Sequence, residues 1–332
     1  MLYLMLDSSG FGGIESHVLQ LSLLIREKKV PFKVIFLSHV DHHPLYRLLD
    51  NNQVDYIVAP GFFSLLFLFK SDDVIHAHGY KSSLWARCLK LFRRCKVLTT
   101  FHAGEFLIGR LAFYEQLNRY TSFLSVNFAV SDDIKSKVPF PCSVLNNFIH
   151  AIPPFLFRSR HKILQVGFVG RLCHVKGIDR YLQLSNQCPT IQFHVFGDGE
   201  EANLLASYSN VKWHGAVEDM SGNWNQLDLL LIPSRAEGLP MAALEAMANG
   251  IPVIGTQVGD LSRLVDSRWL VETYEWPKLV WYILCFDSMT NKEWQACSKY
   301  SYIQVTNNFS GIQRWSILAS AYGVNRETTD KC

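Results

Sequence analysis

The sequence predicts an α/β protein made of two doubly wound, Rossmann-like domains. Short apolar runs, often rich in β-branched residues, alternate with helical patterns along the chain, as expected of parallel strands joined by right-handed helical connections. A chain of 332 residues suits two domains, at ~150 residues each. The segment 151–160 contains Pro153-Pro154 and interrupts the alternation, so it is the expected linker. We therefore assign the first domain to residues 1–155 and the second to residues 156–308.

The strands of the first domain are expected at a series of apolar runs. These are Leu2–Leu6, Phe32–Leu37, Val54–Ala59, Val74–Ala77, Lys96–Phe101 and Leu124–Val130. A glycine-rich turn, Gly10–Gly13, follows the first run and leads into a helical pattern that reaches about Lys29.

The second domain is expected to repeat the scheme. Its apolar runs are Ile163–Val169, Gln192–Phe196, Leu227–Ile232 and Pro252–Thr256. Helices are expected to begin near Gly177, Glu200 and Met241. A final helix is expected at about 309–325, because Ile312, Trp315, Leu318 and Tyr322 recur there at helical spacing.

Composition excludes several classes of protein. Hydrophobic residues make up 48% and charged residues 18%, which is atypical of disordered chains. The longest apolar run, 61–69, is far shorter than the ~18 residues of a membrane span, and residues 1–6 lack the basic start of a signal peptide. The eight cysteines contain no C-x-x-C pair, so we expect reduced thiols in a cytoplasmic protein.

The strongest local motif is Ser234–Glu245, which joins an apolar strand to a helix that Gly250 would end, with Pro240 suited to the first helical position. Glu237 lies at the carboxyl end of the strand, where open α/β sheets bind ligands, and Glu245 lies in the early turns of the helix. Two carboxylates near one cleft suit the vicinal hydroxyls of a ribose or a sugar ring. Alternatively, both acids could only complement the helix dipole.

A second motif, Val169–Asp179, is another strand-to-helix transition. Arg171 and Lys176 lie on its connecting loop, and Gly170 and Gly177 allow close approach of the backbone. Two cations beside a helix N-terminus make an anion site, most naturally for a diphosphate. The alternative is a solvated loop with surface charges.

Two glycine motifs are weaker signals. Gly197 and Gly199 follow a strand and could form an ordinary turn. Gly12 and Gly13 follow the first strand, but their spacing does not fit G-x-G-x-x-G and no acid follows at the usual place. A nicotinamide-dependent oxidoreductase is therefore disfavoured.

Together these residues resemble the retaining glycosyltransferases of the GT-B fold, glycosyltransferase family 4, also described as glycosyl transferases group 1. The resemblance covers nearly the whole chain, and the Glu237–Glu245 spacing is its most specific part. The other matching positions are Gly12, Gly13, Glu15, His76, His78, Thr100, His102, Ser131, Ile134, Asn147, Gly170, Arg171, Lys176, Gly177, Gly197 and Gly199. The resemblance implies a GT-B fold in which two Rossmann-like domains face each other across a cleft. It also implies that the helix at about 309–325 packs back on the first domain.

The resemblance implies a role for each matched residue. Arg171 and Lys176 would hold the donor diphosphate, Glu245 the ribose and Glu237 the transferred sugar. His102 would face the sugar and the acceptor. Further donor-binding positions would be Gly12 and Gly13 at the phosphates, Gly197 and Gly199 at the base, and Gly238, Leu239 and Pro240 at the sugar.

No metal ion or other cofactor is expected, because fixed cations and a helix N-terminus can stabilise a leaving diphosphate. His76 and His78 could suggest a metal pair, but the sequence shows no third ligand, so a structural or cleft-lining role is favoured. The chain departs from the resemblance after Asn147, where Phe148 stands in place of a glycine and His150 in place of an acid.

We expect a retaining glycosyltransferase that uses a nucleotide sugar, UDP-linked rather than GDP-linked. The expected acceptor is a glycan or lipid-linked glycan of bacterial lipopolysaccharide, capsule or exopolysaccharide synthesis, and no nucleic-acid partner is expected. Two alternatives remain: a nucleotide-sugar-binding protein without transfer activity and a GT-B sugar-nucleotide epimerase. The complete set of Arg171, Lys176, Glu237 and Glu245 favours the transferase.

The segment 81–96 carries an apolar helical pattern and a basic one. The basic residues are Arg87, Lys90 and Arg94, within a first half of the chain that is basic overall. One interpretation is a helix packed on the sheet with solvated charges. The other is contact with an anionic membrane surface, which would place the protein peripherally on the inner face of the plasma membrane.

Overall fold

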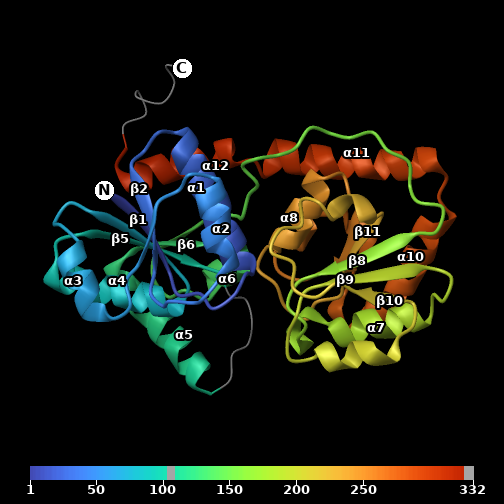
Figure 1. The fold of residues 1–332 in the computed structure, drawn as a ribbon, viewed down its shortest axis with the longest axis horizontal. Helices are drawn as coiled ribbons and strands as arrows, with labels where there is room; N and C mark the ends of the chain where they lie inside the picture. The colour runs from blue at the N-terminus through green and yellow to red at the C-terminus, as the bar shows by residue number, and fades with distance from the viewer. Residues whose placement is uncertain (103–108, 325–332) are drawn as a thin grey trace. The chain divides into compact units, whose positions relative to one another are not determined.

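The computed structural model describes residues 1–102 and 109–324. The chain divides into two compact units (Figure 1). The first comprises Met1–Ala151 with Gly311–Cys332, and the second comprises Ile152–Ser310. Each unit is built on its own parallel sheet flanked by helices, which confirms the predicted α/β class with two doubly wound sheets.

Over the described ranges, the first unit contains a parallel sheet in the order β3-β2-β1-β4-β5-β6-β7. The strands are β1 (Leu2–Leu6), β2 (Phe32–Phe36), β3 (Tyr56–Val58), β4 (Val74–His78), β5 (Lys96–Phe101), β6 (Val126–Ala129) and β7 (Cys142–Val144). The helices are α1 (Gly13–Glu27), α2 (Pro44–Asn51), α3 (Phe62–Leu68), α4 (Tyr80–Phe92), α5 (Arg110–Tyr120), α6 (Asp132–Ser136) and α12 (Gly311–Tyr322). The strand order reverses between β1 and β4, so the carboxyl ends of these strands form the switch point at which such sheets bind ligands.

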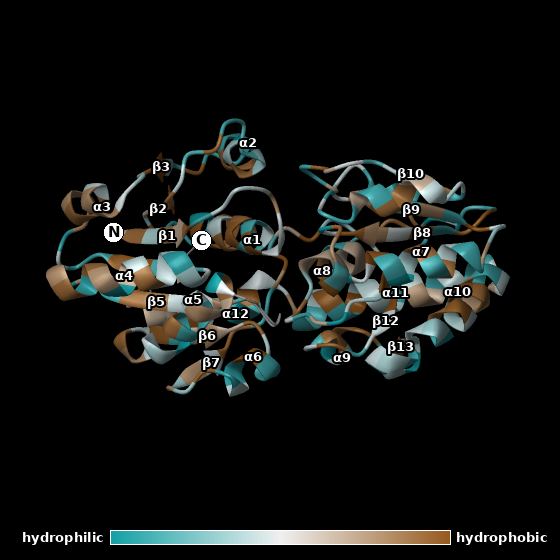
Figure 2. Cartoon of the chain, turned by 90° about the horizontal axis from the view of Figure 1, so that it is seen from below, coloured by the Kyte–Doolittle hydropathy of each residue, from teal (hydrophilic) through white to brown (hydrophobic). Residues whose placement is uncertain are grey.

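Strand β1 shows why the central strands of this sheet are continuous apolar runs. Leu4 and Leu6 face a core formed with α1, α2 and α12, whereas Tyr3 and Met5 face a second core formed with α3 and α4. Successive side chains of a strand point to opposite faces, and both faces are covered by helices, so every position is buried. The apolar colouring of β1 is visible in Figure 2.

The second unit contains a parallel sheet in the order β10-β9-β8-β11-β12-β13. The strands are β8 (Gln165–Val169), β9 (Gln192–Phe196), β10 (Val211–Trp213), β11 (Leu229–Ile232), β12 (Val253–Thr256) and β13 (Leu270–Val271). The helices are α7 (Ile178–Asn186), α8 (Met241–Ala248), α9 (Leu261–Leu264), α10 (Leu279–Ser288) and α11 (Asn291–Asn308). The order reverses between β8 and β11, so the loops that follow these two strands meet at the switch point. The α-helix expected near Glu200 is instead a 3-10 segment, Ala202–Ser207, without a side-chain cap.

Helix α12 lies in the first unit although it follows the second unit in sequence. Trp315, Leu318 and Tyr322 enter the core beside α1, whereas Ile312 is 65% exposed and does not belong to the buried set, contrary to the prediction. The helix ends at Tyr322, and residue 325 of the expected range lies outside the described residues. At its start, a Cβ atom on Gly311 would lie 3.2 Å from the ring of Phe148, so the absence of a side chain there makes room for that ring.

Helix α4 corrects one expectation. Arg87 was predicted to belong to a basic exposed face, but its side chain is buried and Arg94 lies beyond the end of the helix. The Arg87 guanidinium donates to Asn118, Thr121, Ser125 and Thr99, because α4 packs against α5, the turn that follows α5, and β5. Polar partners, rather than solvent, therefore satisfy this charge.

Candidate functional site

The loop between β8 and α7 carries Arg171 and Lys176 at the carboxyl edge of the second sheet. Gly177 caps α7 with a φ of 74°, a left-handed conformation that favours glycine. A Cβ atom at Gly177 would also stand 2.4 Å from the carbonyl oxygen of Pro233. Gly177 offers no side-chain cap at the start of α7, the Asp179 carboxylate accepts a hydrogen bond from the Arg180 amide, and Arg171 in the same loop is exposed. An uncapped helix start with nearby cations favours an anion.

The loop between β11 and α8 brings Glu237 to Lys176. The Lys176 Nζ donates to both carboxylate oxygens at 2.8 and 2.7 Å, and Ser234 Oγ donates to Oε1 at 2.8 Å. Glu237 is only 8% exposed, so these hydrogen bonds replace most of its hydration. The structure thus joins two predicted site residues as partners of each other. A donor phosphate that engaged Lys176 would have to replace this ion pair.

Arg235 holds the same two loops together, and sequence reasoning did not single it out. Its guanidinium donates to both carboxylate oxygens of Asp179 at 2.7 Å and to the carbonyl oxygen of His174. Burial raises the pKa of Asp179, but Arg235 outweighs that effect and the pKa is lowered overall. The sequence did contain a signal for Arg235, because this residue lies between Ser234 and Glu237 in the strongest motif.

Gly197 and Gly199 have a structural reason to be glycine. A Cβ atom on Gly197 would lie 1.9 Å from the carbonyl oxygen of Gly170, and one on Gly199 would lie 2.4 Å from that of Leu172. The loops that follow β8 and β9 can therefore approach this closely only without side chains. This structural requirement does not test the predicted role of the two glycines at the base pocket, which stays a prediction.

The remaining predicted residues of the second unit lie along the β11–α8 connection. The Gly238 carbonyl oxygen accepts a hydrogen bond from the Asp260 amide at 2.8 Å, and Leu239 is buried. Pro240 is the capping residue of α8 rather than its first helical residue, a shift of one position within the usual uncertainty of helix ends. Glu245 lies within α8 and is half-buried. Apart from Glu245, the donor-binding residues predicted in the second unit thus lie in loops that follow its strands.

Gly12 and Gly13 lie in the first unit, at the start of α1. The Gly12 amide donates to Glu15 Oε2 at 2.8 Å, and burial raises the pKa of Glu15. Gly12 has an extended conformation that any residue can adopt, and a Cβ atom on Gly13 would meet nothing within 4 Å. Neither glycine is therefore required by backbone conformation, but a Cβ atom on Gly12 would lie 3.3 Å from Glu15 Oε2, so only Gly13 leaves open space.

His102 follows β5 and lies in a cluster of histidines that the sequence shows only in part. Nδ1 of His78, at the end of β4, lies 3.1 Å from Nε2 of His102. His17 on α1 packs on both, with ring centroids 5.4 Å from His78 and 4.8 Å from His102. His76 lies 4.3 Å from His78 by centroid but is held by other groups, the Tyr322 hydroxyl and the Thr100 hydroxyl. Sequence reasoning missed His17, because it is far in sequence from the others.

Burial keeps these histidines neutral. It lowers the pKa of His17 to about 4 and that of His76 to about 3. It also holds the pKa values of His78 and His102 well below their usual range, and the neighbouring histidines lower them further. At neutral pH, each ring therefore offers an uncharged nitrogen lone pair.

An exposed apolar surface lies on α3 and the end of α4, next to each other in the first unit. Its members, termed here the α3–α4 surface, are Phe63, Phe67, Leu91 and Phe92, which are 67–84% exposed. The Phe62 ring lies between the helices, 6.5 Å from Phe63 and 6.3 Å from Phe92 by centroid. The exposed basic residues nearest in sequence are Lys70, Lys90, Arg93, Arg94 and Lys96. Within the described part of the chain, no helix has the length and apolarity needed to cross a membrane.

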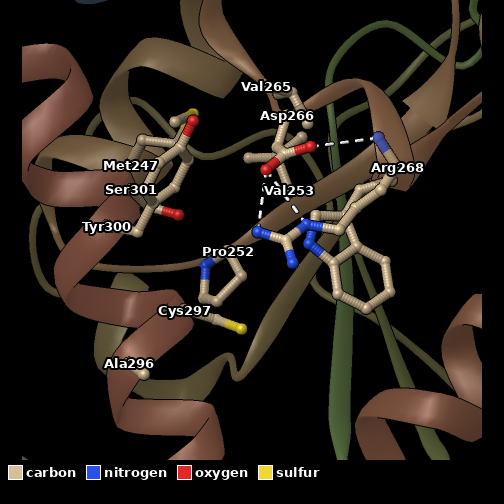
Figure 3. Close-up of a pocket in the computed structure, with 11 residues that line it drawn as sticks. Met247, Pro252, Val253, Val265, Asp266, Arg268, Ala296, Cys297, Tyr300 and Ser301 are labelled. Atoms are coloured by element: carbon tan, nitrogen blue, oxygen red, sulfur yellow. Dashed lines mark hydrogen bonds and ion pairs between the residues drawn. The ribbon is translucent and has the colours of Figure 1, made fainter.

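A separate pocket of about 290 Å³ lies in the second unit between α8, α11 and the β12–β13 region (Figure 3). Its wall is mostly apolar and includes Met247, Trp269 and Tyr300. The polar group at its edge is the ion pair of Arg268 with Asp266, whose oxygen lies 2.8 Å from the guanidinium. None of the predicted site residues lines this pocket.

Comparison with known sequences locates a family match in the second unit. Residues 164–284 match the family model described as "Glycosyl transferases group 1". The chain is 27% identical over 296 residues to the O-antigen biosynthesis glycosyltransferase WbnH of Escherichia coli, covering 79% of this chain and 83% of that protein. It is 37% identical over 105 residues to a GDP-mannose-dependent alpha-mannosyltransferase of Corynebacterium glutamicum, covering 31% of this chain and 25% of that protein.

Solved structures resemble the chain over its whole length. Alr3699/HepE of Anabaena, in complex with UDP and glucose, superposes with a TM-score of 0.77 at 17% identity and covers 97% of this chain and 99% of its own. The lipopolysaccharide outer core galactosyltransferase WaaB gives a TM-score of 0.65 at 16% identity with the same coverage. At these identities the likeness establishes the fold.

Proposed function

Since the chain is a glycosyltransferase of the group 1 type with the GT-B fold, we propose that it transfers a sugar from a UDP-sugar to a glycan acceptor with retention of configuration. The observation that carries this proposal is the constellation at the carboxyl edge of the second sheet. There, Lys176 and Glu237 are paired beside the uncapped start of α7, and Arg171 is exposed in the same loop.

In the proposed reaction, the second unit handles the charge that develops as the sugar–phosphate bond breaks. Arg171, Lys176 and the start of α7 hold the diphosphate and stabilise its growing negative charge. When Lys176 turns to the phosphate, Glu237 loses its cation and becomes able to accept hydrogen bonds from hydroxyls of the transferred sugar. Ser234 keeps the carboxylate in position during this exchange, because it donates to the same oxygen. Glu245 takes the ribose, and no protein nucleophile is proposed.

The donor site is proposed to work without a metal ion or another cofactor. In this proposal fixed cations and helix amides hold the diphosphate, so its charge needs no metal to neutralise it. Solved relatives in complex with UDP, such as HepE, favour a uridine nucleotide over a guanosine nucleotide. The mannosyltransferase that uses GDP-mannose matches a shorter part of the chain.

The proposed acceptor is a glycan or lipid-linked glycan of a bacterial surface polysaccharide. The support is that relatives matching most of the chain are O-antigen biosynthesis glycosyltransferases, together with the α3–α4 surface. Exposed aromatic side chains beside exposed cations suit the boundary of an anionic membrane. We place the protein in the cytoplasm, at the inner face of the plasma membrane.

A thermal-shift screen against UDP-, GDP- and ADP-sugars tests the donor. A ligand that binds the folded state raises the melting temperature in a concentration-dependent way. We expect stabilisation by UDP-sugars and by UDP, and product formation with retained configuration once an acceptor extract is added. Stabilisation by GDP-sugars alone would contradict the choice of nucleotide. Acceptor-independent release of UDP with an epimerised sugar would contradict transfer.

A further inference from the structure

We propose that His17, His78 and His102 form a binding site for a divalent transition-metal ion, with Zn²⁺ as the ion that the ligand set suits best. One ring nitrogen from each residue lies within 4.8 Å of one from each of the other two. Within residues 1–102 and 109–324, no other group of three or more histidine, cysteine or acidic side chains has this arrangement. Three imidazole ligands with a fourth position for water are a common set for zinc.

Regular elements hold two of the three ligands, and the third directly follows a strand. His17 lies on α1, His78 is the last residue of β4, and His102 directly follows β5, the parallel neighbour of β4. The three therefore meet at the carboxyl edge of the first sheet, beside the switch point. Ligands held by packed helices and strands keep their relative positions better than ligands on loops.

Several ring nitrogens in this cluster lack the partners that buried polar atoms usually have. Both ring nitrogens of His17 and Nε2 of His78 are buried without a hydrogen bond of ordinary geometry. Burial has the largest effect on the pKa of His17 and lowers it, whereas an interaction with the Asn147 side chain raises it. Buried imidazole nitrogens are normally satisfied, so the two His17 nitrogens without a hydrogen bond indicate that a partner is missing. A metal ion would supply that partner for one nitrogen of His17, and it would bind His78 through Nδ1, the nitrogen nearest His102.

The spacing of the ligand nitrogens suits a metal. The 3.1 Å between His78 Nδ1 and His102 Nε2 is close to the ~3.3 Å that separates two nitrogens on a tetrahedral zinc with bonds of ~2.05 Å.

His76 shows why the proposed set has three members and not four. Its Nδ1 lies 2.8 Å from the Tyr322 hydroxyl and its Nε2 lies 2.7 Å from the Thr100 hydroxyl, so both nitrogens are engaged. His76 instead packs on the ring of His78 and orients it. The pair predicted from sequence, His76 and His78, is therefore not the proposed ligand pair.

The site has a consequence for transfer, and this part rests on the proposed function. His102 is proposed to face the sugar and the acceptor, and a ring nitrogen bound to a metal cannot make a hydrogen bond to either. Added Zn²⁺ should therefore inhibit transfer, and a chelator should restore it. Metal binding itself needs neither donor nor acceptor, so its measurement is independent of the reaction.

The test is a titration of the chelator-treated full chain with Co²⁺, followed by competition with Zn²⁺. We expect visible d–d absorption that saturates at one ion per chain and disappears when Zn²⁺ is added. His17→Phe and His102→Gln should each weaken binding by at least about tenfold. His214→Gln is the matched control, because His194 Nδ1 and His214 Nε2 lie 2.9 Å apart in the second unit without a third ligand. That variant should bind Co²⁺ like the wild type.

Binding without saturation at one ion, or equal affinity in wild type and His102→Gln, would overturn the proposal. If His17→Phe did not fold, His102→Gln and X-ray absorption on the wild-type cobalt complex would decide whether the three histidines bind the ion. A coordination shell with three imidazole nitrogens supports the site, and a shell with sulfur or fewer imidazoles overturns it. Cys88 and Cys285 are exposed thiols that could bind cobalt, so a Cys88→Ser, Cys285→Ser variant should keep the full signal.

Discussion

Glu237 and Glu245 are eight residues apart in sequence, but the structure gives them different surroundings. Glu237 lies in the β11–α8 loop, almost fully buried, with Lys176 and Ser234 on its carboxylate. Glu245 lies in α8, the helix that follows this loop, and its side chain is half-buried. The two carboxylates can therefore be tested separately.

Glu245→Gln should weaken the binding of free UDP by about 1.5–3 kcal/mol, because a charge-assisted hydrogen bond to the ribose is lost. Glu237→Gln should leave free UDP binding nearly intact and lower turnover, because its contact to the sugar strengthens only as the bond breaks. Calorimetry with UDP and steady-state rates measure the two effects. Equal weakening of UDP binding in both variants would contradict the assignment.

Arg87 provides a test of structure rather than function. Arg87→Ala should lower the free energy of unfolding by roughly 2–4 kcal/mol, because it leaves a cavity and several buried oxygens without a donor. Lys90→Ala, on the exposed side of the same helix, should change it by less than about 0.5 kcal/mol. Denaturant unfolding of both variants is the measurement. Similar stability of the two would show that the Arg87 network is not formed in solution.

At the scale of elements, helix α3 and the end of helix α4 together form the α3–α4 surface. Helix α3 buries Leu65 and exposes Phe63 and Phe67 on its other side. The hydrophobic run 61–69 thus divides between core and surface, a division that the uninterrupted apolar sequence could not reveal.

Replacing Phe63 and Phe67 with Ser should reduce partitioning of the protein to vesicles that contain anionic lipid, because the apolar contact with the bilayer boundary is lost. Lys70→Glu and Arg94→Glu should reduce it further, by about 1 kcal/mol for each removed charge. Tyr274→Ser with Trp281→Ser removes similarly exposed aromatics from the second unit and is the control. Equal partitioning of all variants in a vesicle sedimentation assay would show that the α3–α4 surface does not contact the membrane.

The carboxyl edge of the first sheet should make stability sensitive to acid. The pKa of His17 is lowered to about 4 and that of His76 to about 3, against ~6.5 in the unfolded chain. Below pH 6.5 the unfolded chain binds protons that the folded chain does not, so stability is lost as pH falls from 6.5 toward these values. Each such group should cost about 2 kcal/mol between pH 7 and pH 5.

Denaturant unfolding of the chelator-treated protein at pH 7 and pH 5 measures this loss. His17→Phe should reduce the difference by about 2 kcal/mol, since one titrating group is removed. A variant as acid-sensitive as the wild type would mean that His17 does not remain neutral in the folded protein.

At the scale of the whole molecule, the donor site and the histidine cluster belong to different units. Transfer should persist in EDTA, because in the proposed reaction Arg171, Lys176 and helix amides neutralise the diphosphate and the histidine site takes no part. Rates with and without chelator, at saturating donor, are the measurement. Loss of turnover that Mg²⁺ or Mn²⁺ restores would contradict a metal-independent donor site.

Much of each sheet could be predicted because its central strands are buried on both faces and so form continuous apolar runs. Three of the four outer strands could not: β7, β10 and β13 contain two or three residues each, too few for a period, whereas β3 lies within the predicted run Val54–Ala59. The topological position of Arg171, Lys176 and Glu237 was also predictable, because residues that follow parallel strands share one sheet edge.

By itself, the sequence determined the α/β class, the central strands and the glycosyltransferase motifs of the second half, because these depend on local apolar patterns and fixed spacing. Only the tertiary structure decided which partner each charge has. It paired Lys176 with Glu237, buried Arg87 among hydroxyls and amides, and brought His17 to His78 and His102. The physical reason is that such contacts join residues separated by about 12 to 85 positions, and chain folding, not local spacing, sets those distances.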